Sequence, residues 1–313
     1  MTETAVIARG LTRRFGQFTA VDRVDLNIAK GEIVGFIGPN GAGKSTTLRM
    51  LCGLLTPSSG EARVAGYDVG REPEALRQHI GYMSQKFSLY GDLTVRENLR
   101  FFGGLYRVSR NEVEARIRAA VEMAGLTGRE DALVGTLAGG WKQRLALGCA
   151  ILHRPPVLFL DEPTSGVEPQ ARRKFWDLIH ELAAQQVAIL VSTHYMDEAE
   201  YCNRIALIDA GRIVAMGSPG ELRRRDLGGT LYELDCGALG AALAALHHAP
   251  AVIDAAIFAD KLHVLLSRSS NVEALTALLA RHGISCGIAH QIMPSLEDVF
   301  VQLVAKPTSG AAA

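Results

Sequence analysis

Residues 38–46 read Gly38-Pro39-Asn40-Gly41-Ala42-Gly43-Lys44-Ser45-Thr46, and they follow the apolar run Ile33–Ile37. The spacing G-x-x-x-x-G-K-S predicts a strand over 33–37, a glycine-rich loop and a helix over 44–51. The glycines leave room for a backbone whose N–H groups converge on an anion, and the positive end of the following helix adds to the attraction. We expect Lys44 to contact the β- and γ-phosphates of a nucleotide and the Ser45 hydroxyl to hold Mg²⁺.

A second motif, Val157-Leu158-Phe159-Leu160-Asp161-Glu162, places two carboxylates directly after a buried strand. Because ligands bind at the carboxyl ends of strands in open α/β sheets, we expect Asp161 to complete the Mg²⁺ shell. Glu162 is expected to orient or deprotonate the attacking water. The two motifs together indicate a nucleoside triphosphatase or a kinase. A GTPase would be expected to carry an Asn-Lys-x-Asp base-reading motif, which the sequence lacks.

The charge of the chain is balanced, with 33 lysines and arginines against 33 aspartates and glutamates. This balance gives no general attraction to polyanions, so we expect no nucleic-acid partner. The five cysteines are scattered and never spaced as Cys-x-x-Cys, which favours reduced thiols over a disulfide framework or a zinc site.

Nothing in the sequence predicts a membrane anchor. No apolar run reaches the roughly 18 residues that a membrane span needs, and the short polar start Met1–Thr4 is unlike a signal peptide. We therefore expect the chain to reach a membrane only through partners.

The first 225 residues alternate short β-branched runs with helical stretches, which predicts one α/β domain over 1–225. Helical spacing between Val95 and Leu152, with helices over 95–106 and 110–124, predicts a helical insertion over about 86–152. The expected strands of this domain are Ala5–Leu11, Val24–Ile28, Ile33–Ile37, Ala62–Ala65, Ile80–Met83, Val157–Leu160, Ala188–Ser192, Ile205–Ile208 and Ile213–Met216.

A second, smaller domain is expected over 230–305, after a hinge at Gly228-Gly229. Its pattern predicts strands at 231–234, 252–258, 262–266 and 284–289 and helices at 239–246, 272–282 and 296–304. That order is typical of a small α+β, ferredoxin-like domain. The tail 306–313, with Pro, Ser, Gly and Ala, is expected to be disordered.

The stretch Leu137-Ala138-Gly139-Gly140-Trp141 resembles the signature motif of the ABC (ATP-binding cassette) ATPases, which usually reads L-S-G-G-Q. It lies between the helical insertion and the Asp161-Glu162 strand, as in that family, and the resemblance covers about residues 5–225. The resemblance implies an α/β fold of the P-loop NTPase cassette type, with a mixed central sheet, an antiparallel β subdomain and a helical subdomain. It also implies that the chain binds and hydrolyses ATP with Mg²⁺.

Further residues match the family's pattern. Phe15, with Phe18 as its rival, matches the aromatic that stacks on adenine; Gln85 matches the glutamine that reaches the metal and the water; His194 matches the histidine at the γ-phosphate. Glu168, in Ser165-Gly166-Val167-Glu168, matches the loop that crosses the dimer interface. The resemblance thus implies three sets: catalytic Lys44, Gln85, Glu162 and His194; metal-binding Ser45, Gln85 and Asp161; nucleotide-contacting Phe15, Gly38, Pro39, Asn40, Gly41, Ala42, Gly43, Lys44, Ser45, Thr46, Gln85, Ala138, Gly139, Gly140, Glu168 and His194.

The sequence departs from the family's usual pattern at three positions of the signature motif and the interface loop. Ala138 stands where serine is usual, Trp141 where glutamine is usual and Glu168 where aspartate is usual. A missing neutral hydrogen bond costs about 0.5–1.5 kcal/mol, so the Ala138 departure is expected to slow or weaken the cycle without abolishing it. The resemblance implies a second cassette as partner, and both a homodimer and a heterodimer stay open.

The far end of the chain, Met293-Pro294-Ser295-Leu296-Glu297-Asp298-Val299-Phe300, resembles the ending of exporter ATPases that pair with ABC-2-type permeases. The stretch Ser88–Leu99 matches the surface that receives the membrane subunit in that family. The resemblance implies a cytoplasmic subunit, peripheral on the inner face of the cell membrane, that drives drug or small-molecule efflux. Two alternatives stay open: a soluble ABC ATPase acting on ribosomes or DNA, and a small-molecule sensor role for 230–305.

Overall fold

The computed structural model describes residues 3–85, 89–247 and 249–305. The chain divides into two compact units, Met1–Pro219 and Gly220–Ala313. The division comes earlier than the hinge predicted at Gly228-Gly229, and Gly229 is the first residue of β11 (Gly229–Leu234) in the second unit. The tail predicted to be disordered, 306–313, lies outside the described residues, as does Ser88 of the predicted partner surface.

The first unit is built on a six-stranded sheet in the order β10-β9-β3-β8-β7-β6. The strands β9, β3, β8, β7 and β6 are parallel, and β10 at the edge is antiparallel to β9. Every residue of β3, β7 and β8 is buried, as their continuous apolar sequences predict for strands covered on both faces. The strands span β3 (Ile33–Ile37), β6 (Ile80–Met83), β7 (Val157–Asp161), β8 (Ala188–Thr193), β9 (Arg204–Asp209) and β10 (Arg212–Gly217).

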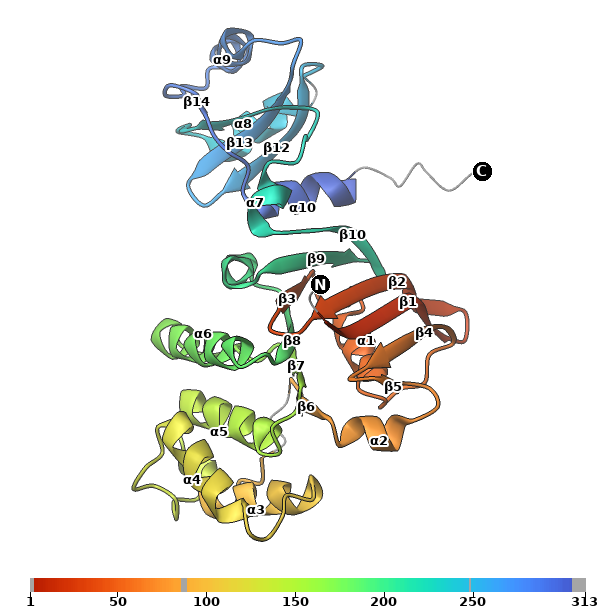
Figure 1. The fold of residues 1–313 in the computed structure, drawn as a ribbon. Helices are drawn as coiled ribbons and strands as arrows, with labels where there is room; N and C mark the ends of the chain where they lie inside the picture. Colours follow the sequence, from red (N-terminus) through yellow and green to blue (C-terminus); the bar gives the residue numbers. More distant parts are fainter. Residues whose placement is uncertain (1–2, 86–88, 248, 306–313) are drawn as a thin grey trace. The chain divides into compact units, whose positions relative to one another are not determined.

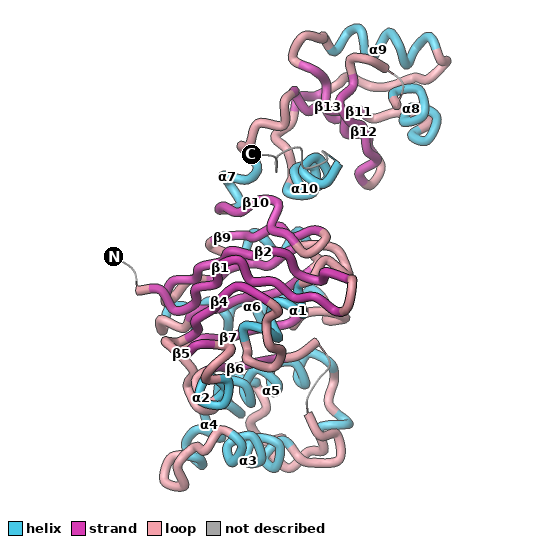
Figure 2. The backbone as a smooth tube through the Cα atoms, turned by 90° about the vertical axis from the view of Figure 1, so that its right-hand side faces the viewer, coloured by secondary structure: helices cyan, strands magenta, loops and turns pink. Residues whose placement is uncertain are grey.

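A smaller antiparallel sheet, in the order β2-β1-β4-β5, forms the second layer of this unit (Figure 2). Its strands are β1 (Thr4–Phe15), β2 (Phe18–Ala29), β4 (Ser59–Val64) and β5 (Tyr67–Asp68). One apolar core joins the two sheets through α1 (Lys44–Leu51), with Val24 of β2, Phe36 of β3 and Leu48 of α1 as fully buried members. Figure 1 shows α6 (Pro169–Ala184) on the opposite side of the six-stranded sheet from α1. The short elements of the unit are α2 (Pro73–Arg77) and η2 (Met196–Tyr201), and α7 (Pro219–Arg223) starts at its boundary.

The helical insertion forms a subdomain with a core of its own. Its helices are α3 (Val95–Leu105), α4 (Val113–Ala124), η1 (Val134–Thr136) and α5 (Gly139–Ile151). Thr94 and Glu97 form a capping box at the start of α3, because the Thr94 side chain accepts from the Glu97 N–H and the Glu97 carboxylate accepts from the Thr94 N–H. The helix predicted from residue 110 begins only at Val113.

The second unit has four antiparallel strands in the order β12-β13-β11-β14. Its elements are β11 (Gly229–Leu234), α8 (Leu239–Leu246), β12 (Val252–Phe258), β13 (Lys261–Ser267), α9 (Val272–Arg281), β14 (His290–Gln291) and α10 (Leu296–Ala305). The succession of strands and helices is the one that the sequence indicates, and the ferredoxin-like assignment stays a prediction.

Two expectations for the second unit are wrong. The strand predicted over 284–289 is reduced to a single bridge at Cys286, and the fourth strand is only His290–Gln291. Cys236 and Cys286 form a disulfide, where the sequence favoured reduced thiols. The reason is tertiary: the antiparallel bridge brings residues 50 positions apart to a Cα–Cα separation of 4.1 Å. The remaining cysteines, Cys52, Cys149 and Cys202, are free and buried.

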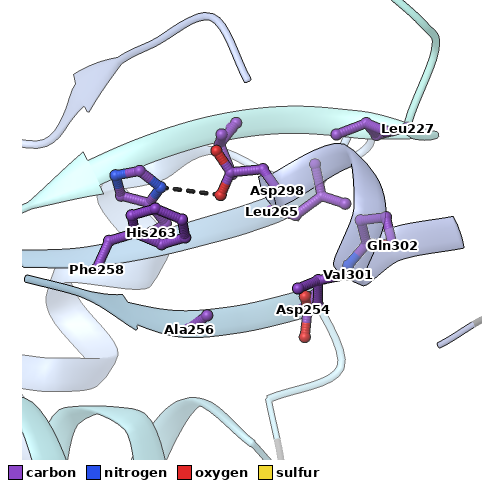
Figure 3. Close-up of a pocket in the computed structure, with 10 residues that line it drawn as sticks. Leu227, Asp254, Ala256, Phe258, His263, Leu265, Asp298, Val301 and Gln302 are labelled. Atoms are coloured by element: carbon purple, nitrogen blue, oxygen red, sulfur yellow. Dashed lines mark hydrogen bonds and ion pairs between the residues drawn. The ribbon is translucent and has the colours of Figure 1, made fainter. Parts of the chain in front are cut away.

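A buried polar cluster fixes α10 within the second unit (Figure 3). The Asp298 carboxylate accepts from His263 Nδ1 at 2.9 Å through one oxygen and from the Ser295 N–H at 2.8 Å through the other. Asp298 N–H in turn donates to Ser295 Oγ at 3.1 Å, so the two residues form a capping box at the start of α10. The cavity beside this cluster has a volume of about 20 Å³, which is room for about one water molecule and too little for a drug-sized ligand.

None of the helices in the described part of the chain has the length and apolar character to cross a bilayer.

The half-buried His153, between α5 and β7, is expected to make the stability of the fold depend on pH. Its ring stacks on Tyr106 at 3.9 Å and its Nε2 lies 3.0 Å from the Ile80 carbonyl oxygen. Burial lowers the pKa of His153 from 6.5 to about 4, so the folded state favours the neutral ring. Its stabilising contribution is therefore complete above pH 6.5 and is lost as the pH falls toward 4.

We expect His153→Gln, which keeps a donor for the Ile80 carbonyl, to remove this part of the pH dependence. Thermal unfolding between pH 7 and pH 4.5 checks the prediction, with the exposed His282→Gln as control. A melting temperature that falls with pH as steeply in His153→Gln as in the unaltered protein contradicts it.

Candidate functional site

Residues 38–43 form the loop that joins β3, which ends at Ile37, to α1, which begins at Lys44. Gly43 adopts φ 103°, where a side chain is strained, and a Cβ at this position would meet the Ala20 carbonyl oxygen at 2.6 Å. The Lys44 side chain is only 4% exposed, and its Nζ donates to the carbonyl oxygens of Gly38 at 2.8 Å and Pro39 at 3.0 Å. The loop therefore curls around the lysine and directs a buried cation toward its own concave face.

Asp161, the last residue of β7, forms hydrogen bonds to residues of two other elements, α1 and β8. Its Oδ1 accepts from Ser45 Oγ of α1 at 2.9 Å and from Ser192 Oγ of β8 at 2.7 Å. Ser192 Oγ in turn accepts from the Glu162 N–H at 3.0 Å. Two of the three predicted metal-binding side chains thus face each other, and the structure adds Ser192, which the sequence did not single out.

The Glu162 side chain is 7% exposed, and three other side chains of the site approach its carboxylate. Gln85 Nε2 donates to its Oε2 at 2.9 Å, Lys44 Nζ lies 3.4 Å from its Oε1, and His194 Nδ1 lies 3.4 Å from its Oε2. These partners come from the ends of β6 and β8 and from α1. All four residues predicted to be catalytic are thus brought together around one carboxylate.

Two other titratable groups near Asp161, Tyr82 and Cys52, are neutral near pH 7. Burial raises the pKa of Tyr82 to about 12, and the negative charge of Asp161 adds to the shift. Burial also raises the pKa of Cys52 well above its ordinary value, again with a contribution from Asp161. Both side chains therefore stay protonated near neutral pH and add no negative charge to the pair of carboxylates.

The signature residues line a separate cavity of about 340 Å³. Ala138, Gly139 and Gly140 border it at the start of α5, and Gly166 and Glu168 border it from the segment before α6. Glu168 thus lies beside the signature residues of its own chain. Trp141 is half-buried against the helical core, and the Arg129 guanidinium lies 3.9 Å from the centroid of its ring.

The aromatic residues near the start of the chain are exposed. Phe15 ends β1 and pairs with Phe18 at the start of β2, and the two are 47% and 65% exposed. The Arg13 guanidinium lies 4.6 Å from the Phe15 ring centroid. Both rings are therefore available for stacking, and the choice of Phe15 over Phe18 stays a prediction.

Two further residues support the segment between Asp161 and α6. Glu198 is fully buried and accepts from Thr164 Oγ1, and Arg172 Nε lies 3.6 Å from the same carboxylate oxygen. Arg172 also covers the Tyr195 ring at 4.4 Å. The sequence analysis did not single out Arg172 or Glu198 for this role, because the contact between Thr164 and Glu198 joins residues 34 positions apart.

The residues around Lys44 fit a magnesium–nucleotide complex. Gly41 has φ 83°, which favours glycine, and a Cβ there would meet nothing within 4 Å, so the loop backbone is open on that side. Mg²⁺ in nucleotide sites prefers one or two protein oxygens together with phosphate oxygens, and Ser45 Oγ and Asp161 Oδ1 supply such a pair. Among the described residues there is no group of three or more His, Cys, Asp or Glu side chains that could hold a metal ion.

Comparison with known proteins agrees with this geometry. The family described as "ABC transporter" matches residues 21–165, and a family described as "AAA domain, putative AbiEii toxin, Type IV TA system" matches residues 142–196. The linearmycin resistance ATP-binding protein LnrL of Bacillus subtilis is 34% identical over 304 residues, which are 96% of this chain and 98% of LnrL. The probable multidrug ABC transporter ATP-binding protein YbhF of Escherichia coli is 50% identical over 221 residues, or 71% of this chain, but the match spans only 38% of YbhF.

Solved structures share the fold of the first unit. One is a dimeric ATP-binding cassette in a post-hydrolysis state bound to ADP and Pi, with a TM-score of 0.62 and 28% identity. It covers 68% of this chain, and this chain covers 98% of it. The cassette fold predicted from the sequence is thereby confirmed.

Ala138 generates a prediction about stability. It is the N-cap residue of α5, with φ −65° and ψ 153°, and its side chain makes no capping hydrogen bond. We expect Ala138→Ser to supply that bond and to raise the unfolding free energy by about 1 kcal/mol. Urea unfolding followed by the fluorescence of Trp141 and Trp176 measures the change. The control is Ala115→Ser, which places a hydroxyl on an exposed turn inside α4; an equal gain in both variants contradicts the capping argument.

Proposed function

The chain belongs to the ABC transporter ATP-binding proteins, and from this premise we propose that it is the ATP-binding and ATP-hydrolysing subunit of an ABC exporter. The observation that carries the proposal is the convergence of Lys44, Gln85 and His194 on Glu162, next to the pair Ser45 and Asp161. Relatives named for drug resistance and multidrug transport support drug or small-molecule efflux as the work that hydrolysis drives.

ATP binding would replace the contacts that the loop now makes with itself. Lys44 leaves the Gly38 and Pro39 carbonyl oxygens and pairs with the β- and γ-phosphates, while the backbone N–H groups of 38–46 surround them. Phe15 stacks on the adenine. Ser45, Asp161 and Gln85 would hold Mg²⁺, which would supply positive charge against the charge that develops on the phosphates.

Hydrolysis needs a water molecule in line with the bond that breaks. Glu162 accepts a hydrogen bond or a proton from that water. Gln85 holds the Glu162 carboxylate, and His194 contacts the γ-phosphate. The water oxygen bonds to the γ-phosphorus as the bond to the ADP oxygen breaks. The three neighbours of Glu162 already hold its side chain in place, so little reorganisation is required.

A second cassette would complete the site. Ala138, Gly139 and Gly140 at the start of α5 offer backbone N–H groups and a positive helix end to the γ-phosphate bound by the partner, and Glu168 crosses the interface. A dimer closed by two nucleotides opens when they are hydrolysed. The partner is an identical chain or a different cassette.

The membrane partner we propose is an ABC-2-type permease, which places the chain at the cytoplasmic face of the membrane. Two stretches support an ABC-2-type permease by their resemblance to exporter ATPases: Met293–Phe300 and Ser88–Leu99. Tyr90, Phe101 and Leu105 are 46%, 45% and 55% exposed, and the rings of Tyr90 and Phe101 meet edge to face at 4.9 Å. Such an exposed apolar group suits contact with a protein partner.

Two substitutions separate binding from chemistry. We expect Glu162→Gln to keep ATP binding, because a Gln side chain accepts hydrogen bonds in the same place, and to lower turnover by at least about 100-fold. Lys44→Ala is expected to weaken binding itself. Nucleotide binding and phosphate release are measured on both, with the exposed Glu122→Gln as control. Unchanged turnover in Glu162→Gln refutes the role assigned to Glu162.

The transport proposal has its own test. We expect the tagged Glu162→Gln chain, extracted from membranes in mild detergent with ATP and Mg²⁺, to co-purify with a multi-span membrane protein in stoichiometric amount. A second, different cassette in the same complex would establish a heterodimer. Recovery only from the soluble fraction, with ribosomes or DNA-bound proteins, contradicts the exporter role and leaves the ATPase intact.

A further inference from the structure

The first unit contains a buried carboxylate that the proposed reaction does not use. The Glu198 side chain, in η2, is fully buried. Its Oε1 accepts from Thr164 Oγ1 and lies 3.6 Å from Arg172 Nε. A carboxylate is costly to bury unless it is paired and hydrogen-bonded, so the place of Glu198 in the fold depends on these two partners.

The contact between Thr164 and Glu198 joins two segments that each contain a candidate catalytic residue. Thr164 is 1% exposed and follows Glu162 by two residues, in the segment that ends at Glu168 before α6. Glu198 follows His194 by four residues, in the short helix after β8. A shift of one segment is therefore resisted by the other.

Arg172, in the first turn of α6, contacts the segment that follows His194 in three ways. Its Nε approaches Glu198, its Nη1 donates to Asp197 Oδ2 at 3.3 Å, and its guanidinium carbon lies 4.4 Å from the centroid of the Tyr195 ring. The two acids hold the planar group over the ring, where cation–π attraction also favours it. Arg172 thus links α6 to the face of the Tyr195 ring.

The Tyr195 ring also packs against the imidazole of His194. The centroids of the two rings are 4.1 Å apart, and the planes of the rings differ by 37°. His194 Nδ1 is buried and forms no hydrogen bond within the described part of the chain, and it lies 3.4 Å from Glu162 Oε2. Because no hydrogen bond fixes this nitrogen, the orientation of the imidazole depends on the ring packed against it.

We propose that Arg172 is a positioning residue for ATP hydrolysis. Its guanidinium, held by Glu198 and Asp197, supports the Tyr195 ring and, through it, the imidazole of His194. The inference rests on the proposed function, because the contact of His194 with the γ-phosphate belongs to that proposal. A misplacement of about 1 Å can slow a reaction about 100-fold, so loss of the support is expected to lower turnover while the phosphate loop still binds ATP.

The position of the His194 ring can be measured without nucleotide. In the full-length protein labelled with ¹³C-histidine, the ring signal that is missing in His194→Gln identifies His194. We expect this signal to shift in Arg172→Gln, because the Tyr195 ring that faces the imidazole loses its support. Arg173→Gln makes the same change at the next residue of α6, which is exposed, and is expected to leave the signal in place. An unchanged signal of His180, also on α6, shows that the helix remains folded.

Two further variants separate the ring contact from the charge. Arg172→Lys keeps a positive charge beside Glu198 but lacks the planar group, so we expect the His194 signal to shift in this variant too. Glu198→Gln has nearly the shape of the original side chain and keeps an acceptor for Thr164, and it is expected to shift the signal in the same direction by a smaller amount.

Turnover of ATP with Mg²⁺ is measured on the same proteins. We expect it to fall about tenfold in Arg172→Gln and in Arg172→Lys, with the Kd for ATP changed by less than about twofold. Arg173→Gln is expected to match the unaltered protein in both quantities.

Three results overturn the inference: a His194 signal that stays in place in Arg172→Gln, an equal shift in Arg173→Gln, or full turnover in Arg172→Lys. Unchanged turnover in His194→Gln instead refutes the catalytic role proposed for His194. The signal of His194 in the Arg172 variants is read without ATP, so the failure of the positioning inference and the failure of the proposed function are distinguished.

Discussion

The hydrogen bonds that converge on Asp161 Oδ1 are the constraint on which the first unit depends. Ser45 of α1 and Ser192 of β8 both donate to this atom, at 2.9 Å and 2.7 Å, from positions 116 and 31 residues away. The central strands are buried along their whole length, so polar side chains reach an open space only where the strands end. The fold therefore delivers its hydroxyls and carboxylates to one edge of the sheet.

The same constraint explains the conformation of Glu162. It follows the last residue of β7 and has φ 49°, in a region that costs a non-glycine residue about 1–3 kcal/mol. The N–H bonded to Ser192 and the side chain bonded to Gln85 hold it there. These contacts hold the strained backbone in place and keep the Glu162 carboxylate beside Lys44 and His194. Such a fixed position suits a group that must act on a water molecule at one place.

Much of this was predictable from the sequence, and the exceptions have identifiable causes. The strands 33–37 and 80–83 and the helix 44–51 are observed as predicted, because buried runs and the glycine-rich loop set their limits locally. Ser192 and Glu198 were missed because their roles come from neighbours 31 and 34 residues away. The disulfide between Cys236 and Cys286 and the short strand at 290–291 likewise depend on tertiary pairing, which cysteine spacing and strand propensity do not reveal.

The most direct test of the account is whether Ser45 ligates the metal. Replacing its hydroxyl by a thiol, in Ser45→Cys, exchanges a hard oxygen ligand for a soft sulfur, which disfavours Mg²⁺ and favours Cd²⁺. ATP turnover is measured for the unaltered protein and for this variant with each metal. The account predicts that the variant loses turnover with Mg²⁺ and regains it, relative to the unaltered protein, with Cd²⁺. The same ratio of variant to unaltered activity with both metals would contradict a metal site at Ser45 and Asp161.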